Sequence, residues 1–257
     1  MPLLRKPIDS TELFRMKGIL LAGGYGTRLR PLTYITNKHL LPVYDKPMIE
    51  YGLEALYLAG IKDICVVLGG AKPEDVIKYL GNGYKYGVDL SYKWQGEPKG
   101  IAHAILCTKD FVKENAFVVH LADNIFPDGI SDLVRNFDES NCDARILLVK
   151  VKNPEGYGVA EIKNNKLVGL EEKPKKPKSN LIIAGVYCLK PSVFRIIEEL
   201  KPSWRGELEI TDTLHKMVTS PKYKVEHHIY EGQWFDCGSF ENILEAGLFI
   251  KERMRGR

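Results

Sequence analysis

A glycine-rich segment that ends in an arginine is the part of the sequence with the clearest chemistry. It reads Leu21-Ala22-Gly23-Gly24-Tyr25-Gly26-Thr27-Arg28-Leu29. The glycines directly follow an apolar run that spans Gly18 to Leu21. Glycines lack the Cβ atom that would block close approach, so consecutive backbone N–H groups can turn toward anionic oxygens. Arg28 adds a forked donor that is always charged. The pattern predicts a binding site for a polyphosphate where a strand ends.

Two common phosphate-binding loops do not fit this segment. A Walker loop ends in Gly-Lys followed by Ser or Thr, and a dinucleotide fingerprint needs Gly-x-Gly-x-x-Gly. The chain reads Gly24-Tyr25-Gly26-Thr27-Arg28-Leu29, with leucine in the last glycine position. The sequence therefore disfavours a P-loop kinase and an NAD-binding protein.

A second segment narrows the interpretation. It reads Asn37-Lys38-His39-Leu40-Leu41-Pro42-Val43-Tyr44-Asp45-Lys46-Pro47-Met48-Ile49. Together the two segments resemble the sugar-phosphate nucleotidyltransferases, and within them the glucose-1-phosphate thymidylyltransferase branch. Matching segments cover nearly all of residues 16 to 250 in the family's order. The resemblance implies an enzyme that makes dTDP-glucose and pyrophosphate from dTTP and α-D-glucose 1-phosphate, by attack of the sugar phosphate on the α-phosphorus.

The resemblance assigns roles to three cations. Arg28 would grip the leaving pyrophosphate, and Lys38 would reach the triphosphate or the attacking phosphate from the other side. Lys173, in Glu171-Glu172-Lys173-Pro174, would bind the sugar phosphate. Such a displacement depends on holding the reacting groups in line and on neutralising charge at the phosphoryl oxygens. We therefore expect these three side chains to carry catalysis.

Two aspartates are expected to hold Mg²⁺. Asp123 follows the apolar run 117–122, which places it at the carboxyl end of a parallel strand, where open α/β sheets bind ligands. By resemblance its partner is Asp236, in Trp234-Phe235-Asp236-Cys237-Gly238. Two carboxylates, with water and phosphate oxygens in the other positions, are usual ligands for this ion. The metal would polarise the α-phosphoryl group.

The resemblance also identifies residues that would bind the nucleotide. Gln95 and Gly100 match the segment that reads a pyrimidine, since an amide offers a donor and an acceptor to an imide edge. The other expected nucleotide ligands come from the glycine segment and the strand end: Leu21, Gly23, Gly24, Gly26, Thr27, Arg28 and Asp123.

A sugar pocket is expected from the second half of the chain. Hydroxyl-rich ligands need carboxylate acceptors, backbone groups and an aromatic wall. By resemblance the sugar phosphate would meet Tyr157, Gly158, Glu172, Lys173, Ile183, Gly185, Tyr187 and Arg205. The acidic residues Glu207 and Glu209 suit the first turn of a helix at least as well as a ligand.

The spacing of apolar residues switches between strand and helix patterns along the chain, and it predicts the elements that must position these residues. Buried strands are expected at 18–21, 64–68, 116–122 and 144–151, and a half-buried strand at 88–94. Helices are expected between them, at 47–59, 73–80, 100–111 and 130–138. This alternation is typical of a mostly parallel sheet with helices on both faces.

The second half changes character. A hairpin is expected from strands 159–162 and 167–170 around Asn164-Asn165, followed by a buried strand at 182–189 and a last strand at 225–230. Helices are expected at 191–200, 211–218 and 240–253. The predicted fold is α/β: a Rossmann-like, three-layer α/β/α domain with a mostly parallel or mixed central sheet and an inserted sugar-binding subregion. Residues 16–257 would form it, with a nucleotide-binding half at about 16–125 and a sugar-binding half at about 126–257. Residues 1–15 are interpreted as an extension of unknown role.

Composition excludes several classes of protein. At 257 residues and 44% hydrophobic composition, the chain can bury an ample core. The formal charge of +4 comes from the two ends, 1–15 and 251–257, which argues against a nucleic-acid-binding face. The five cysteines lack a Cys-x-x-Cys pair and read as reduced thiols, and no apolar run is long enough for a membrane span. We expect a cytoplasmic protein with no nucleic-acid or membrane partner.

Two alternatives stay open at this stage. Thymine and uracil differ by one methyl group, worth about 1 to 3 kcal/mol in a fitted contact, so a uridylyltransferase or an enzyme that uses both dTTP and UTP is possible. A non-catalytic regulatory protein that binds nucleotide sugars is the second alternative, although such proteins tend to lose the charged residues that this chain keeps. The resemblance further implies a homo-oligomer, a dimer or tetramer.

Overall fold

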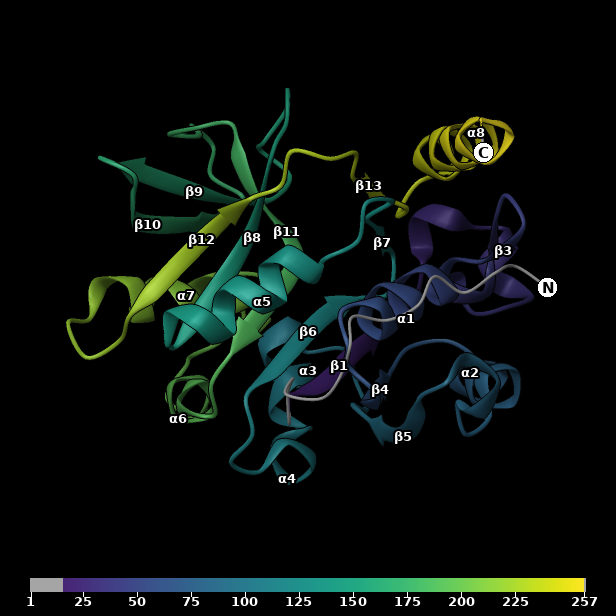
Figure 1. Ribbon diagram of the computed structural model, residues 1–257, viewed down its shortest axis with the longest axis horizontal. Helices are drawn as coiled ribbons and strands as arrows, with labels where there is room; N and C mark the ends of the chain where they lie inside the picture. Colours follow the sequence, from purple (N-terminus) through teal and green to yellow (C-terminus); the bar gives the residue numbers. More distant parts are fainter. Residues whose placement is uncertain (1–15, 257) are drawn as a thin grey trace.

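A nine-stranded mixed sheet runs through the molecule. The structure is a computed structural model, and it describes residues 16–256. The main path of the sheet has the order β10-β9-β11-β6-β1-β4-β5, and β8 pairs with both β11 and β12. Figure 1 shows β5 and β4 at one end of the molecule and β9, β10 and β12 at the other.

The strands in the first half of the sheet are parallel to one another, and the central ones are apolar on both faces. β1 (Lys17–Ala22) lies between β4 (Asp63–Leu68) and β6 (Phe117–Leu121), and it is parallel to both. β5 (Asp89–Trp94) continues the parallel order beyond β4. Consecutive buried residues in β1, β4 and β6 fit a sheet covered by helices on both sides. Parallel strands end at the same edge, so the segments after β1 and β6 lie close together.

The second half adds antiparallel pairs. β11 (Leu181–Leu189) runs antiparallel to β6 and to β8 (Ala144–Lys150), and β12 (Val225–Ile229) runs parallel to β8. β9 (Gly158–Lys163) and β10 (Lys166–Glu172) form the expected hairpin. Its turn residues Asn164 and Asn165 have φ of 49° and 59°, as a type I′ turn requires.

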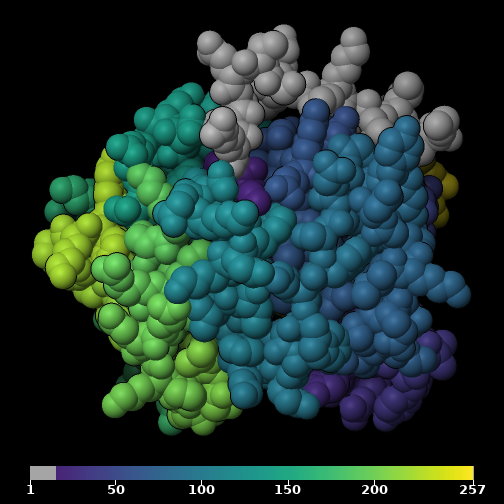
Figure 2. All heavy atoms as spheres, turned by 90° about the horizontal axis from the view of Figure 1, so that it is seen from below, coloured from purple at the N-terminus to yellow at the C-terminus, as the bar shows by residue number. Residues whose placement is uncertain are grey.

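Helices cover both faces of the sheet and make the three predicted layers. One core contains buried residues of α1 (Met48–Leu58), α2 (Pro73–Leu80) and α5 (Ser131–Ser140). The other contains residues of α3 (Ile101–Leu106), α4 (Lys109–Val112), α6 (Ser192–Glu198) and α7 (Ile210–Thr219). α3 packs against α6 and α7, so the two halves of the chain meet directly, as the space-filling view shows (Figure 2).

α8 (Phe240–Arg255) lies apart from these layers and has its own small core. That core joins it to β2 (Pro42–Val43) and to the short antiparallel pair of β7 (Asn124–Ile125) and β13 (Phe235–Asp236). The other short strand is β3 (Lys46–Pro47), which pairs with β2. Short 3₁₀ turns occupy Thr27–Leu29, Leu32–Tyr34, Lys38–Leu40 and Tyr84–Tyr86.

The fold class predicted from the sequence is confirmed, but the short strands β2, β3, β7 and β13 were not expected, and one expected helix is divided. The single helix expected at 100–111 is two helices, α3 and α4. Thr108 separates them, because its hydroxyl and its backbone N–H both donate to the carbonyl of Ile105, at 2.7 and 2.9 Å. A hydroxyl that bonds back to its own backbone competes with helix continuation.

Within residues 16–256, no helix combines the length and the apolar character that crossing a membrane would need.

Candidate functional site

The glycine segment forms the first wall of the candidate site. It leaves β1 at the carboxyl edge of the sheet and leads into the 3₁₀ turn Thr27–Leu29. Gly26 has φ of 61°, and its carbonyl accepts a hydrogen bond of 2.9 Å from the hydroxyl of Thr33. A Cβ atom on Gly70, in the loop after β4, would lie 2.3 Å from the carbonyl oxygen of Gly24. The segment is therefore held by close backbone contact.

Arg28 is exposed and points toward the Asp236 loop. A Cβ atom on Gly238 would lie 2.4 Å from its guanidinium, so the backbone there passes directly beside the charge. Arg28 is also one of the positive charges that act on the Asp236 carboxyl. Residues more than 200 positions apart thus meet at one edge of the sheet.

Lys38 forms an ion pair with Asp123. Its Nζ donates to Oδ2 of Asp123 at 2.6 Å, and both side chains are about 15% exposed. The 3₁₀ turn that carries Lys38 is capped by Asn37, whose Oδ1 accepts from the backbone N–H of His39 at 3.0 Å. The Asn37 amide also donates to the carbonyl of Ala71 at 2.7 Å. The lysine is therefore fixed from two directions.

The pairing of β7 with β13 brings the two aspartates together. Asn124 is the register partner of Asp236, and the backbone N–H of Cys237 donates to the carbonyl of Asp123 at 2.8 Å. The Asn124 amide donates to Oδ1 of Asp123 at 3.0 Å. Its own oxygen accepts from the indole N–H of Trp234 at 2.7 Å. The strand pairing thus brings the two aspartates close together, and the Asp123 carboxylate is held by its neighbour Asn124.

The pKa values of the two carboxyl groups are shifted in opposite directions by their surroundings. Burial alone would raise the pKa of Asp123, but the positive charge of Lys38 and hydrogen bonds from Lys38 and Asn124 outweigh it, and the pKa lies below the usual range. The pKa of Asp236 is raised, first by burial and then by the negative charge of Asp123, despite the opposing effect of Arg28. Two acids that repel one another in a buried place favour a bound cation.

The chemistry of the two carboxylates fits a divalent metal ion. Across residues 16–256, no group of three or more His, Cys, Asp or Glu side chains is arranged to hold a metal by itself. Mg²⁺ is usually held by one or two carboxylates and completes its shell with water and substrate phosphates. The mutual repulsion of Asp123 and Asp236 would be relieved by such an ion.

The expected base-reading residues lie next to the glycine segment. The Gln95 amide donates to the carbonyl of Gly100 at 3.0 Å, and its Oε1 would be 3.3 Å from a Cβ atom on Gly23. Gln95 is buried, and the backbone of Gly23 lies close to it. The side chain of Leu21 belongs to the core, so only its backbone can face a ligand.

Glu172 is the centre of the expected sugar cluster. Its Oε2 accepts from the hydroxyl of Thr211 at 2.5 Å, and its Oε1 lies 3.7 Å from Arg205 and 4.0 Å from Lys173. Burial raises its pKa, partly countered by the Thr211 hydrogen bond. A Cβ atom on Gly158 would lie 3.3 Å from this carboxylate and 3.0 Å from Ile183. Arg205 also binds Glu207 and Glu209, at 3.0 and 3.2 Å.

Lys173 has an unusual backbone conformation. Its φ is 45°, a left-handed value that is uncommon for a residue with a side chain, and its N–H donates to the carbonyl of Tyr157 at 3.0 Å. Such conformations concentrate at functional sites, where surrounding structure holds them in place. Lys72 and Lys113 have similar φ values, so the conformation by itself does not mark Lys173 as a site residue.

Tyr157 connects the sugar cluster to the two aspartates. Its hydroxyl donates to Oδ2 of Asp236 at 3.4 Å, and its ring packs edge-on against Trp234, with centroids 5.7 Å apart. Burial and the negative charge of Asp236 raise its pKa to about 12. Gly185 packs against Asn124, while the side chains of Ile183 and Tyr187 lie in the core.

Several contributing residues were absent from the sequence-based set. Asn124, Thr211 and Asn242 each donate a hydrogen bond to a candidate site residue; the Asn242 amide donates to the carbonyl of Asp236 at 2.6 Å. Asn37 and Trp234 instead hydrogen-bond neighbours of such residues, Ala71 and Asn124. Asn124 and Trp234 stand next to the expected aspartates in sequence, which was a usable signal. Nothing in the sequence marks Thr211 or Asn242.

Comparisons with known proteins find relatives that are described as nucleotidyltransferases. A family model described as nucleotidyl transferase matches residues 17–253. A low-salt glycan biosynthesis nucleotidyltransferase, Agl11 of Haloferax volcanii, is 45% identical over 238 residues, which are 92% of this chain and 66% of that protein. The glucose-1-phosphate thymidylyltransferase of Streptomyces antibioticus is 42% identical over 94% of this chain and 68% of its own length.

Solved structures agree with these relatives. One described as a glucose-1-phosphate thymidylyltransferase from Bacillus anthracis in complex with sucrose has a TM-score of 0.84 and 42% identity, over 92% of this chain and 96% of that one. A UDP-glucose pyrophosphorylase complexed with UDP-glucose has a TM-score of 0.81 and 28% identity, over 93% of this chain and 99% of that one.

Proposed function

Because the chain belongs to the nucleotidyl transferase family, we propose that it forms dTDP-glucose and pyrophosphate from dTTP and α-D-glucose 1-phosphate. One observation carries this proposal. The Lys38–Asp123 ion pair, Asp236 and Arg28 come from segments remote in sequence and meet at the carboxyl edge of the sheet, with Tyr157 linking them to Glu172 and its neighbours. A site with cations and carboxylates beside a hydroxyl-binding cluster suits two phosphorylated substrates.

The cations divide the work between the two substrates. Arg28, exposed beside Gly238, receives the β- and γ-phosphates and stabilises the charge that develops on the leaving pyrophosphate. Lys38 contacts the α-phosphate, and Lys173 binds the phosphate of the sugar. The attacking oxygen forms its bond to the α-phosphorus as the bond to the bridging oxygen breaks. No proton acceptor is needed, because the attacking phosphate oxygen is already ionised.

Asp123 and Asp236 are the residues that would hold Mg²⁺. When bound, the ion acts as a Lewis acid on the α-phosphoryl group and shields the phosphate charges. Asn124 and Asn242 keep the two aspartates in place, through the hydrogen bonds to the Asp123 carboxylate and to the Asp236 carbonyl. Lys38 keeps Asp123 ionised and so able to bind a cation.

Base and sugar bind on opposite sides of this centre. Gln95 and the backbone of Gly23 and Gly100 would read the pyrimidine, and the N–H groups of Gly24, Gly26 and Thr27 would face the phosphates. Glu172 would accept hydrogen bonds from sugar hydroxyls, with the ring against Tyr157. In this scheme 16–125 is the nucleotide-binding half and 126–257 the sugar-binding half. The five free thiols favour a reducing compartment, the cytoplasm.

A second candidate is a UTP-using enzyme. The likeness to a UDP-glucose pyrophosphorylase across most of the chain favours it as the alternative. Thymine gains only the contact of its methyl group, worth about 1 to 3 kcal/mol, so the ratio of specificity constants decides between them.

Release of pyrophosphate tests the proposal. The protein is mixed with Mg²⁺, one of five nucleoside triphosphates, and glucose 1-phosphate or its galactose epimer. We expect the largest kcat/KM with dTTP and glucose 1-phosphate, loss of activity in EDTA, and recovery with excess Mg²⁺. A preference for UTP would establish the second candidate. No release with any pair, together with tight binding of dTDP-glucose, would instead show a non-catalytic binding protein.

A further inference from the structure

Tyr25 and Glu97 form a hydrogen bond between two segments that are 72 positions apart. The Tyr25 hydroxyl donates to Oε2 of Glu97 at 3.0 Å. Tyr25 belongs to the glycine segment after β1, and Glu97 belongs to residues 95–100 after β5, which we call segment 95–100. β1 and β5 are not neighbours, because β4 lies between them in the sheet (Figure 1). The hydrogen bond therefore joins two loops across the end of a third strand.

Two glycines after β4 let these loops approach one another. A Cβ atom on Gly69 would lie 3.3 Å from Oε1 of Gln95, and a Cβ atom on Gly70 would lie 2.3 Å from the carbonyl oxygen of Gly24. The first glycine thus makes room for segment 95–100, and the second makes room for the glycine segment. With side chains at both positions, the two segments would be forced apart.

The two segments meet at two places that are in step. Oε1 of Gln95 would be 3.3 Å from a Cβ atom on Gly23, and two positions later in each segment Tyr25 is bonded to Glu97. In the proposed function the base binds at the first of these places, and the phosphates lie along the glycine segment. The Tyr25–Glu97 pair then closes the nucleotide site next to the base.

Both ends of segment 95–100 are fixed by the backbone. The N–H of Gln95 donates to the carbonyl of Leu68 at 2.8 Å, which continues the pairing of β5 with β4. The carbonyl of Lys99 accepts from the N–H of Leu208 at 2.8 Å. These bonds hold the ends whether or not the Tyr25 hydroxyl is present.

The middle of the segment depends on Tyr25. Gly96 has φ of 73°, and a Cβ atom there would meet nothing within 4 Å, so no neighbouring group packs against it. In the part of the chain that the structure describes, residues 96–98 make one hydrogen bond, the one from Tyr25 to Glu97. Without that bond the stretch next to Gln95 would be tethered only at its ends.

We propose that Tyr25 and Glu97 are positioning residues for the nucleotide, because their hydrogen bond holds the base-reading Gln95 against the glycine segment. The inference rests on the proposed function, which places the base beside Gln95. Such a pair acts on the affinity for the nucleotide and on the choice between bases. It should not act on glucose 1-phosphate, whose expected ligands Glu172 and Lys173 come from the end of β10 and the loop after it.

Equilibrium binding of dTTP, UTP and CTP, measured by isothermal titration calorimetry with Mg²⁺ present, tests the pair. Tyr25→Phe should weaken binding of the preferred nucleotide about tenfold, since a hydrogen bond to a charged acceptor is lost. It should also narrow the preference for that nucleotide over the other two, because Gln95 is held less firmly. In the pyrophosphate-release assay, kcat and the KM for glucose 1-phosphate should change little, since neither residue touches a reacting atom.

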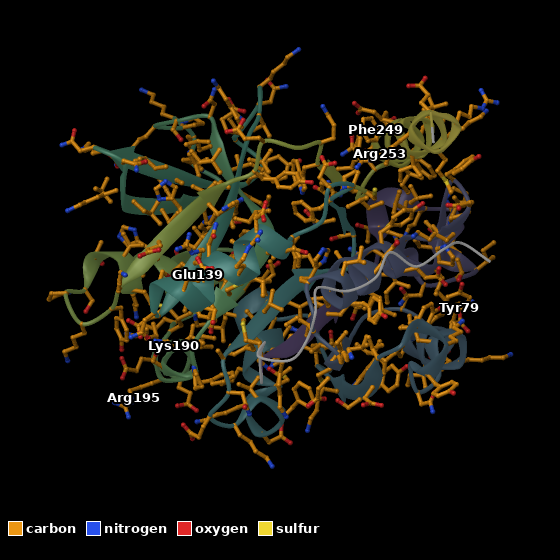
Figure 3. The ribbon with its side chains drawn as sticks, viewed as in Figure 1. Tyr79, Glu139, Lys190, Arg195, Phe249 and Arg253 are labelled. Atoms are coloured by element: carbon orange, nitrogen blue, oxygen red, sulfur yellow. The ribbon has the colours of Figure 1, made fainter. Side chains whose placement is uncertain are left out.

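Tyr79→Phe is the matched control. Tyr79, labelled in Figure 3, also donates to a carboxylate, at 2.6 Å to Oε1 of Glu50, but that bond joins α2 to α1. Removing its hydroxyl should leave the binding of all three nucleotides unchanged. An equal loss of affinity in Tyr79→Phe and Tyr25→Phe would overturn the proposal.

A double-mutant cycle tests whether the two residues act together. Glu97→Ala should weaken nucleotide binding as much as Tyr25→Phe does, and the double variant should be no weaker than either single one. Glu97→Gln keeps an acceptor and should retain most of the affinity. Additive losses, or wild-type affinity in Tyr25→Phe, would overturn the role of the pair and leave the proposed function standing. A wild-type chain that binds none of the three nucleotides would refute both.

Discussion

Gly70 offers the sharpest test of how the phosphate-binding segment is held. It lies in the loop between β4 and α2 with φ of 78°, and a Cβ atom there would be 2.3 Å from the carbonyl oxygen of Gly24. Ordinary contact begins at about 3.4 Å, so Gly70→Ala must push the glycine segment away by about 1 Å. A misplacement of that size in a catalytic site costs about 10²-fold in rate.

Gly60→Ala is the matched control for backbone strain. Gly60 has φ of 86°, and a Cβ atom there would meet nothing within 4 Å. Both alanine variants bear the left-handed backbone cost of about 1 to 2 kcal/mol, so both should melt a few degrees lower. Only Gly70→Ala should lose kcat/KM in the pyrophosphate-release assay. Equal kcat/KM for the two variants would refute the account of the segment.

Three further predictions concern the charged groups. Arg28→Ala should lower kcat/KM by about 10² to 10³-fold with unchanged circular dichroism, whereas Arg195→Ala, an exposed control on α6, should have no effect; equal losses would remove Arg28 from the mechanism. Glu172→Gln should raise the KM for glucose 1-phosphate at least about tenfold while the KM for dTTP changes little, because a hydrogen bond to a charged acceptor is lost; a change confined to dTTP would place the sugar elsewhere. Burial lowers the pKa of His120 from 6.5 to about 4, so the unfolded chain binds its proton first and the free energy of unfolding falls between pH 6.5 and pH 4, by at most about 1.4 kcal/mol per pH unit. His120→Leu should reduce the slope of urea-denaturation stability across that range without abolishing it, because His39 is also buried with a lowered pKa, and an unchanged slope would contradict this assignment.

Much of the fold follows from local pattern. Continuous apolar runs predicted β1, β4 and β6, since strands buried on both faces leave no polar alternation. The Asn164-Asn165 turn predicted the β9–β10 hairpin, because both residues accept left-handed backbone. The break between α3 and α4 was missed, because the competing bond from Thr108 depends on side-chain geometry that periodicity does not report.

The candidate site was harder to derive from local pattern. Arg28, Lys38 and Asp123 stand at strand ends or in distinctive segments, so their neighbourhood could be anticipated. Asp236 reaches them through the two-residue pairing of β7 with β13, which is too short to leave a periodic signal. The supporting contact of Asn242 comes from a helix whose position depends on tertiary packing. Long-range pairings of this kind need a family resemblance or coordinates.

The convergence of Asp123 and Asp236 on one metal beside the nucleotide is the central claim. Electron paramagnetic resonance of Mn²⁺, used in place of Mg²⁺, measures it directly through the amount of free ion during titration with and without dTTP. The wild-type chain is expected to bind Mn²⁺ tightly only when dTTP is present, and Asp123→Asn and Asp236→Asn should each weaken that binding at least about tenfold. Binding of Mn²⁺ and dTTP that is unchanged in both variants would contradict the account.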